Sequence, residues 1–187
     1  MLFGCNEKPA TPTGPNSGDP ELAITLTPWI DPERILAEFF TATSHAERVK
    51  FIFSGVRSEL AMALHRELTP SDNLLVVYKI HDGGHFQGMV VPQKVKGSTG
   101  SMEIVVVIGE DLRVRGVKFQ KYRGSEVVRK ALDSKFEPLL KSSKEFQYSS
   151  LDGLSQDARE DGAAILKAVD SIVTKLRLAR DNPKVIQ

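Results

Sequence analysis

LLVVYKIHDGGHFQGMVV, residues 74–91, contains two β-rich runs on either side of a glycine turn. The first run covers residues 74–80, the turn is Asp82-Gly83-Gly84, and the second run covers residues 85–91. Aliphatic, β-branched and aromatic residues bounded by Asp-Gly are typical of a β-hairpin. The stretch therefore predicts two adjacent antiparallel strands.

A second pair of strands is predicted further along the chain. Residues 103–108 form a β-branched run, Gly109-Glu110-Asp111 supplies a turn, and residues 113–119 alternate polar and apolar side chains. Such alternation is expected of a strand that has one face in water. Two consecutive hairpins predict an antiparallel sheet.

Helical signals dominate the sequence before residue 74. Asp31-Pro32-Glu33 combines an N-cap acid with a proline at the first helical position, which predicts a short helix. Ser44 and Glu47 form a capping box that is followed by apolar residues at helical spacing as far as Val56. Because residues 59–68 continue this signal, the first third of the chain is predicted to be mainly helical.

Helices are also predicted after the sheet, at residues 126–132 and 136–140, and in a long segment from about Asp157 to Arg180. The apolar residues of the last segment share one helical face, whereas several charged residues fall elsewhere. The predicted fold class is α+β, an antiparallel sheet covered by helices, with an N-terminal helical segment and a long C-terminal helix. The apolar face comprises Ile165, Leu166, Val169, Ile172, Val173 and Leu176, and the residues placed elsewhere are Lys167, Asp170, Lys175 and Arg177.

Composition indicates one globular domain with tails: 187 residues, 41% hydrophobic and 26% charged, with 25 basic and 24 acidic residues. A net charge of +1 without a basic stripe argues against nucleic acid as a partner. No apolar run approaches the roughly 20 residues that a membrane-spanning helix needs. We divide the chain into a tail at 1–20, a helical segment at 21–73, an α+β domain at 74–180 and a tail at 181–187.

The N-terminal sequence Leu2-Phe3-Gly4-Cys5 resembles a bacterial lipobox, and Cys5 is the only cysteine. On this interpretation Cys5 is lipidated after a signal peptide is removed, and the protein is anchored in the bacterial cell envelope, facing the periplasm or exterior. Because the charged and apolar parts of a signal do not precede Cys5 here, this interpretation also implies that the sequence is trimmed or that Met1 is not the true start. Residues 6–20 include four prolines and lack apolar periodicity, as expected of a solvated tether. The alternative is a cytoplasmic protein with an unmodified Cys5.

Three local patterns between residues 74 and 173 follow one another in a recognisable order. The first is an opening hairpin, the second is a glycine-rich loop leading through two strands, and the third begins the last helix. They are Val77-Tyr78-Lys79 with Phe86-Gln87-Gly88, residues 97–108 with Gly116-Val117-Lys118-Phe119, and LDGLSQDAREDGAAILKAV at residues 151–169.

Together these patterns resemble the small FMN-binding domain of the NqrC and RnfG subunits of bacterial ion-pumping redox complexes. The resemblance implies an α+β fold with a flavin cleft between the glycine-rich loop and the start of the last helix. It also implies electron transfer at the membrane surface, with a membrane redox complex or a periplasmic electron donor as partner.

The family's site differs from this chain at two places. Its flavin is attached through the threonine of Ser-Gly-Ala-Thr, whereas Ala158 or Arg159 stands here, depending on the alignment, and neither can form the ester. Its Glu-Thr-Pro-Gly turn matches this chain only at Gly124. The resemblance therefore implies non-covalent FMN, held by Gly100, Ser101, Tyr122, Arg123, Ser155, Gln156 and Arg159.

The charges at the start of the last helix act in opposite directions. A helix N-terminus favours an anion such as a phosphate, and Arg159 offers it a forked donor. Asp157, Glu160 and Asp161, however, place carboxylates in the same field and would repel a phosphate. The alternative is that Asp157 is the N-cap, paired with Glu160, and that Arg159 is a solvated surface residue.

Other candidate sites are weaker. His81 and His85 flank Asp82, but two imidazoles and one carboxylate are too few ligands, so exposed loop-tip histidines are favoured and no metal is predicted. Residues 97–100 could cradle an anion through backbone N–H groups. Candidates for stacking on a flavin ring are Trp29, Tyr78, Phe119, Tyr122 and Phe146, and Lys118, Lys121 and Arg123 form a local basic cluster.

Two functional hypotheses follow. The first is an exported, lipid-anchored protein that holds FMN non-covalently and transfers electrons at the membrane surface. The second is a flavin-less binding or scaffold lipoprotein that keeps the fold. No pattern of nucleophile, base and acid assigns an enzymatic reaction.

Overall fold

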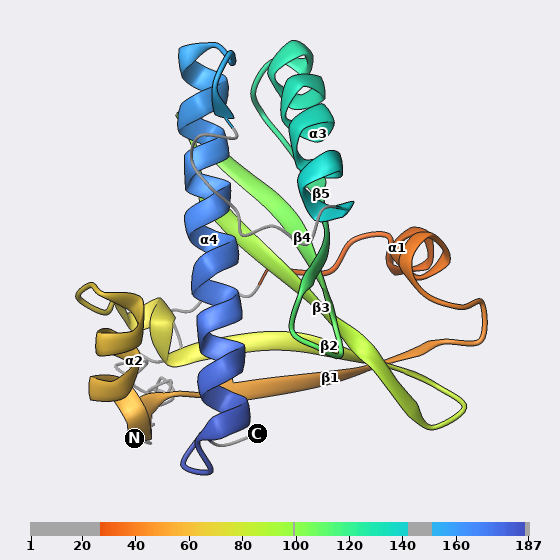
Figure 1. Ribbon diagram of the computed structural model, residues 1–187, viewed down its shortest axis with the longest axis vertical. Helices are drawn as coiled ribbons and strands as arrows, with labels where there is room; N and C mark the ends of the chain where they lie inside the picture. The colour runs from red at the N-terminus through yellow and green to blue at the C-terminus, as the bar shows by residue number, and fades with distance from the viewer. Residues whose placement is uncertain (1–26, 99, 142–150, 186–187) are drawn as a thin grey trace, which may run out of the picture.

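The structure is a computed structural model that describes residues 27–98, 100–141 and 151–185 (Figure 1). Cys5, the predicted tether at 6–20 and Phe146 lie outside these ranges. The described part is an α+β fold, as the sequence predicts, and both predicted hairpins are confirmed.

Five strands form one antiparallel sheet in the order of the chain, β1-β2-β3-β4-β5. Short turns at Gly83-Gly84 and Glu110–Arg113 connect β2 to β3 and β4 to β5, which explains why local sequence signals identified both hairpins. The strands are β1 His45–Ile52, β2 Leu74–Asp82, β3 His85–Lys96, β4 Ser101–Gly109 and β5 Val114–Lys121.

The helix predicted from Ser44 towards Val56 is wrong, because most of that segment is strand β1. It pairs with β2 along its whole length, from His45 opposite His81 to Ile52 opposite Leu74. Val49 and Phe51 alternate with exposed charged residues, and this period of two prevails once β2 offers a partner. The sheet therefore includes strands from both sides of residue 73, where the sequence suggested a division.

The helices are α1 Pro32–Phe39, α2 Arg57–Leu64, α3 Glu126–Lys141 and α4 Gln156–Asp181. Helix α1 begins where the sequence predicts it, although Asp31 makes no capping hydrogen bond. Helix α2 stops short of residue 68 because His65 adopts a left-handed conformation that ends it. The two segments predicted around 126–140 are one continuous helix, α3.

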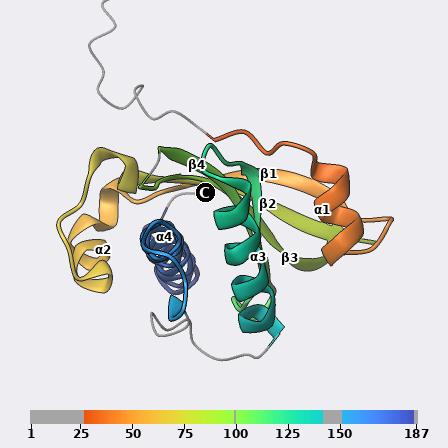
Figure 2. The ribbon, with the colours of Figure 1, turned by 90° about the horizontal axis from the view of Figure 1, so that it is seen from above.

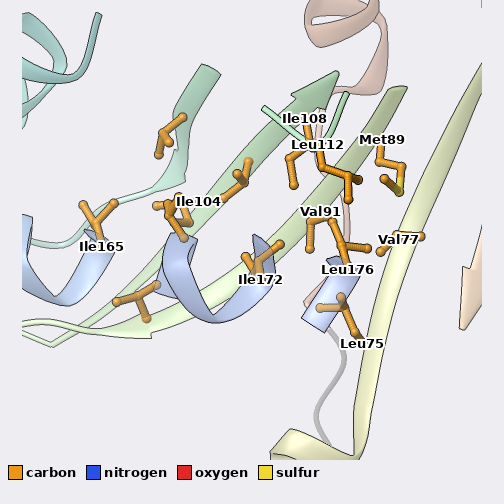
Figure 3. Close-up of a cluster of buried hydrophobic side chains, with 14 of the residues drawn as sticks. Leu75, Val77, Met89, Val91, Ile104, Ile108, Leu112, Ile165, Ile172 and Leu176 are labelled. Carbon is orange, nitrogen blue, oxygen red and sulfur yellow. The ribbon is translucent and has the colours of Figure 1, made fainter. Parts of the chain in front are cut away.

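The two faces of the sheet are covered differently. Helices α2, α3 and α4 pack on one face, with α3 and α4 side by side beneath the strands (Figure 2). On that face Ile165, Ile172 and Leu176 of α4 pack against aliphatic side chains of β2, β3 and β4 (Figure 3). Helix α1 and Trp29 cover part of the other face through a smaller cluster around Ile35.

A buried ion cluster connects α4 to the 3-10 turn Pro70–Asn73, which precedes β2. Asp72 accepts two hydrogen bonds of 2.8 Å from Arg66 and lies 2.9 Å from Lys175 Nζ. Burial acts to raise the pKa of Asp72, but the hydrogen bonds from Arg66 and Lys175 outweigh it and hold that pKa well below its ordinary value. Lys175 is only 6% exposed, so its predicted place on the polar side of the helix is wrong.

Candidate functional site

The glycine-rich loop, the turn after β5 and the start of α4 meet at one buried carboxylate, that of Asp161. Asp161 is 0% exposed and lies in the second turn of α4. It accepts hydrogen bonds from the Ser98 N–H at 2.6 Å, the Ser98 hydroxyl at 2.9 Å and the Tyr122 hydroxyl at 2.7 Å. We call Ser98, Tyr122 and Asp161 the Asp161 cluster.

Glycines allow the segments to approach this closely. A Cβ atom on Gly97 would lie 2.4 Å from Asp161 Oδ1, and one on Gly124 would lie 2.3 Å from the Tyr122 hydroxyl oxygen. Gly162, the next residue in α4, faces Leu151, whose methyl group would lie 2.7 Å from an added Cβ. The glycine at 124 that matched the family's turn therefore has a local role in seating Tyr122.

The electrostatics of the cluster keep Tyr122 a hydrogen-bond donor. Burial raises the pKa of Tyr122, and its hydrogen bond to Asp161 and the negative charges of Asp161 and Asp157 raise it further. The loop at 97–100, a candidate for cradling an anion, uses its Ser98 N–H to hold a carboxylate of the same chain.

The N-cap of α4 is Ser155, whose hydroxyl oxygen accepts a hydrogen bond from the Ala158 N–H at 3.4 Å. The alternative that Asp157 is the N-cap is therefore wrong. Gln156 donates to Glu160 at 3.0 Å, and Arg159 is exposed, as are Asp157 and Glu160. The first turn thus presents two carboxylates and one guanidinium to solvent.

Gly100 and Ser101 face a different part of the molecule. Gly100 has φ +138° and closes the loop through its carbonyl, which accepts from the Gly97 N–H at 2.7 Å. Ser101 begins β4, where its side chain alternates with that of Met102 and so points away from α4. Both residues line a groove on the face of the sheet that α1 only partly covers.

The groove lies where β2 and β3 separate. Their pairing extends only from Asp82 opposite His85 to Tyr78 opposite Val90, although β1 pairs with β2 back to Leu74 and β4 pairs with β3 out to Lys96. Pro92, just beyond the last pair, has no N–H with which to continue the ladder. The two halves of the sheet consequently diverge in Figure 1.

The groove has a volume of about 410 Å³ and a mixed lining. Leu74, Val76 and Pro92 give it an apolar floor, and Lys94 and Lys96 lie on it as exposed cations. Thr27, where the described chain begins, also lines it. An apolar floor with a few polar or charged groups is common in small-molecule binding sites.

The seven residues that the resemblance assigns to flavin are thus distributed over several places. Tyr122 belongs to the Asp161 cluster, Gly100 and Ser101 line the groove, and Arg123 is exposed. Ser155, Gln156 and Arg159 lie together in the exposed first turn of α4.

Sequence reasoning missed Asp161 and Ser98 as partners. Asp161 lies four residues before Ile165, on the apolar face of α4, and an acid on such a face must find hydrogen-bond donors. The four-residue spacing between Asp161 and Ile165 was the sequence signal that could have identified Asp161 as a buried acid.

Four of the aromatic candidates pack on one another in pairs, and one basic candidate is paired with an acid. Trp29 lies 4.9 Å from Tyr78 between ring centroids, and Phe119 lies 5.2 Å from Tyr122, on the opposite face of the sheet. Lys118 forms a 2.6 Å ion pair with Glu38 of α1.

Of the two histidines beside the Asp82 turn, one is placed differently from the sequence prediction. His81 lies within β2 with its side chain 22% exposed and stacks on His45 at 5.6 Å, so the loop-tip prediction is wrong for it. His85, at the turn, is exposed as predicted. Within residues 27–98, 100–141 and 151–185, no group of three or more His, Cys, Asp or Glu side chains is arranged to hold a metal ion.

Among the described residues, no helix combines the length and the apolar composition that crossing a membrane requires. Comparison with models of protein families, with curated proteins and with solved structures finds no match to this chain.

Proposed function

We propose that this protein is a flavin-less binding module of the bacterial cell envelope, with a fold like the one that the resemblance to FMN-binding domains implies. The observation that carries this proposal is the Asp161 cluster. Where the glycine-rich loop, residue 122 and α4 come together, the Ser98 N–H, the Ser98 hydroxyl and the Tyr122 hydroxyl are used by a carboxylate of the chain itself.

The energetics of that cluster support a role without flavin. A flavin phosphate at the Ser98 N–H and the Tyr122 hydroxyl would have to displace Asp161 and would then lie beside a buried negative charge. The exposed carboxylates of Asp157 and Glu160 add further repulsion at the helix start. Hydrogen bonds within the protein hold these segments together, which suits a preformed scaffold.

Non-covalent FMN binding with electron transfer is the second candidate, and the groove favours it. Its volume of about 410 Å³ suits a small ligand, and Gly100 and Ser101 line it with Lys94 and Lys96. A ring on the apolar floor and a phosphate near the lysines would satisfy both kinds of lining. On this candidate the flavin lies on the opposite face of the sheet from Tyr122.

The experiment that separates the two candidates uses the full chain mixed with excess FMN and passed through gel filtration. A flavin-less module elutes without visible absorbance and shows no rise in Tm at high FMN concentration, because a ligand that binds the native state must stabilise it. Stoichiometric flavin absorbance in the protein peak would contradict the proposal.

Two variants locate any flavin that is retained. Arg159→Glu removes the forked donor at the start of α4, and the double variant Lys94→Gln/Lys96→Gln removes the cations of the groove. Loss of flavin only in the first variant would place it at α4, and loss only in the second would place it in the groove. Arg113→Gln, an exposed arginine in the β4–β5 turn, is the control.

The envelope location is supported by the lipobox-like sequence at Cys5 and the proline-rich stretch at 6–20. Expression from the native gene in a bacterial host should give a protein whose N-terminal peptide carries lipid on Cys5 by mass spectrometry. The Cys5→Ser variant should lose this mass and leave the membrane fraction. An unmodified N-terminus in the soluble fraction would instead indicate the cytoplasmic alternative.

A further inference from the structure

We propose that the partner of this module is the surface of an anionic phospholipid bilayer, bound by the sheet face that carries the groove. The proposal rests on the proposed function and names the binding surface. We call this surface the lysine face and define it by the strand residues Arg48, Lys50, Lys94, Lys96 and Lys121, with the acid Glu103 between them. Helix α1, which covers another part of the same sheet face, carries the exposed acids Asp31, Glu33 and Glu38.

The strand register places these residues on one face. Lys50 pairs with Val76, which lines the groove, and Lys96 pairs with Ser101, which also lines it. Glu103 pairs with Lys94 on one side and with Lys121 on the other. Partners in an antiparallel ladder point to the same face, so the lysines surround the apolar floor.

The cations of this face are available to a partner. Lys50, Lys94, Lys96 and Lys121 are exposed, and none makes an ion pair within the ranges that the structure describes. By contrast, Lys118, further along β5, is neutralised by Glu38 at 2.6 Å.

The net charge of this face differs from that of the rest of the chain. The lysine face holds five basic residues and one acid, whereas the net charge of the chain is only +1. The other described residues together carry a net charge of −1, so the positive charge is concentrated on this face. Attraction to an anionic surface is therefore strongest when this face is turned towards it.

The N-terminal chain reaches the domain at the same face. Thr27, where the described chain begins, lines the groove. A lipid on Cys5 would keep the domain at the membrane surface and raise the effective concentration of anionic headgroups at the lysines.

The chemistry of the face suits a bilayer better than a single soluble anion. The lysines are spread over three strands and do not converge on one point, as they would around a phosphate. Leu74, Val76 and Pro92 between them offer an apolar floor. A bilayer is anionic at its headgroups and apolar beneath them, so it complements both the lysines and the apolar floor.

The test is vesicle co-sedimentation of the full chain, with Cys5→Ser so that no lipid anchor contributes. Vesicles of phosphatidylcholine containing roughly one third phosphatidylglycerol are compared with pure phosphatidylcholine at low salt. We expect binding to the anionic vesicles only. The triple variant Lys50→Gln/Lys94→Gln/Lys96→Gln should bind on the order of a hundredfold more weakly, since each lysine near such a surface contributes about fivefold.

The matched control is Lys130→Gln/Lys167→Gln/Arg177→Gln, which removes three exposed charges from α3 and α4 and changes the net charge equally. It should bind within about twofold of the parent. Equal loss in both triple variants, or equal binding to neutral vesicles, would overturn the proposal. Competition by FMN or inorganic phosphate at concentrations far below the ionic strength would also overturn it, because it would place a soluble anion in the groove.

Failure of this inference and failure of the proposed function are distinguishable. If the protein is a flavoprotein, it retains visible absorbance through gel filtration whether or not it binds vesicles. If it is a flavin-less module with another partner, it remains colourless and ignores anionic vesicles.

Discussion

At the scale of single residues, the most demanding position is Asp161. A carboxylate with no exposure on the apolar face of α4 is tolerated only because three hydrogen bonds satisfy it. Removing it leaves the Ser98 N–H and the Tyr122 hydroxyl without their acceptor. The contributions of Asp161, Ser98 and Tyr122 to stability are therefore coupled.

We expect Asp161→Ala to lower the free energy of unfolding by about 1–3 kcal/mol, because it leaves part-buried donors without their charged acceptor. Tyr122→Phe should cost about 1–2 kcal/mol, since it removes one of three hydrogen bonds to a carboxylate. In urea denaturation, the double variant should lose less than the sum of the two singles, as expected for directly coupled residues.

Asp157→Ala is the control for this series, because Asp157 is an exposed acid one turn earlier in the same helix. It should change the free energy of unfolding by no more than about 0.5 kcal/mol. An Asp161→Ala variant as stable as Asp157→Ala would show that the cluster contributes nothing to stability.

Residue patterns also show what the sequence could reveal of the site. The position of Asp161 four residues before Ile165 was readable in advance, whereas its partners Ser98 and Tyr122 lie 63 and 39 residues away. Nothing local indicates which donors a buried acid will find. The seven predicted flavin residues came from the resemblance, and their distribution over several places depends on how β4 and α4 are oriented.

At the scale of elements, prediction succeeded where the signal was local. The Asp-Gly-Gly turn identified β2 and β3, and the apolar face of α4 identified the longest helix. Strand β1 failed because its partner is β2, about 30 residues away, while a capping box at Ser44 favoured a helix. In the structure, Ser44 instead contacts Thr41 through its hydroxyl.

The attachment of α1 to the sheet depends on a glycine. A Cβ on Gly116 of β5 would lie 2.4 Å from the Phe39 ring of α1. We expect Gly116→Ala to cost about 1–3 kcal/mol of unfolding free energy through this overlap. Thermal and urea unfolding followed by circular dichroism measure it.

The second-site test combines Gly116→Ala with Phe39→Ala. Phe39→Ala alone removes a partly buried aromatic ring and destabilises, but in the Gly116→Ala background it also relieves the overlap. The double variant should therefore be more stable than additivity predicts. Strict additivity would mean that the ring moves aside without cost.

At the scale of the whole molecule, the ion cluster of Arg66, Asp72 and Lys175 makes stability sensitive to acid. The pKa of Asp72 is lowered in the folded state, so its contribution is fully present above the ordinary pKa of about 4 and is lost as the pH falls below it.

We expect Asp72→Asn to be about 3–5 kcal/mol less stable than wild type at neutral pH, because Lys175 loses its buried counter-ion. The difference should narrow as the pH falls below about 4. Urea denaturation at several pH values tests both statements. A constant difference from neutral to acid pH would show that the carboxylate charge is not responsible.

Adding Lys175→Met to Asp72→Asn removes the unpaired ammonium and should recover part of the lost stability. Glu33→Gln, which neutralises an exposed acid of α1, is the control and should leave the acid dependence unchanged.

Because β2 and β3 diverge, α4 connects the two halves of the sheet as well as covering one face of it. Near the start of α4, Asp161 accepts hydrogen bonds from Ser98, just before β4, and from Tyr122, just after β5. Near the end of α4, Lys175 forms an ion pair with Asp72, just before β2. These two anchor points are fourteen residues apart, or about 21 Å along the helix axis. The distance along α4 between the buried charges of Asp161 and Lys175 thus fixes how far β1 and β2 diverge from β3, β4 and β5, and the helix acts as a rigid spacer between the two halves of the sheet.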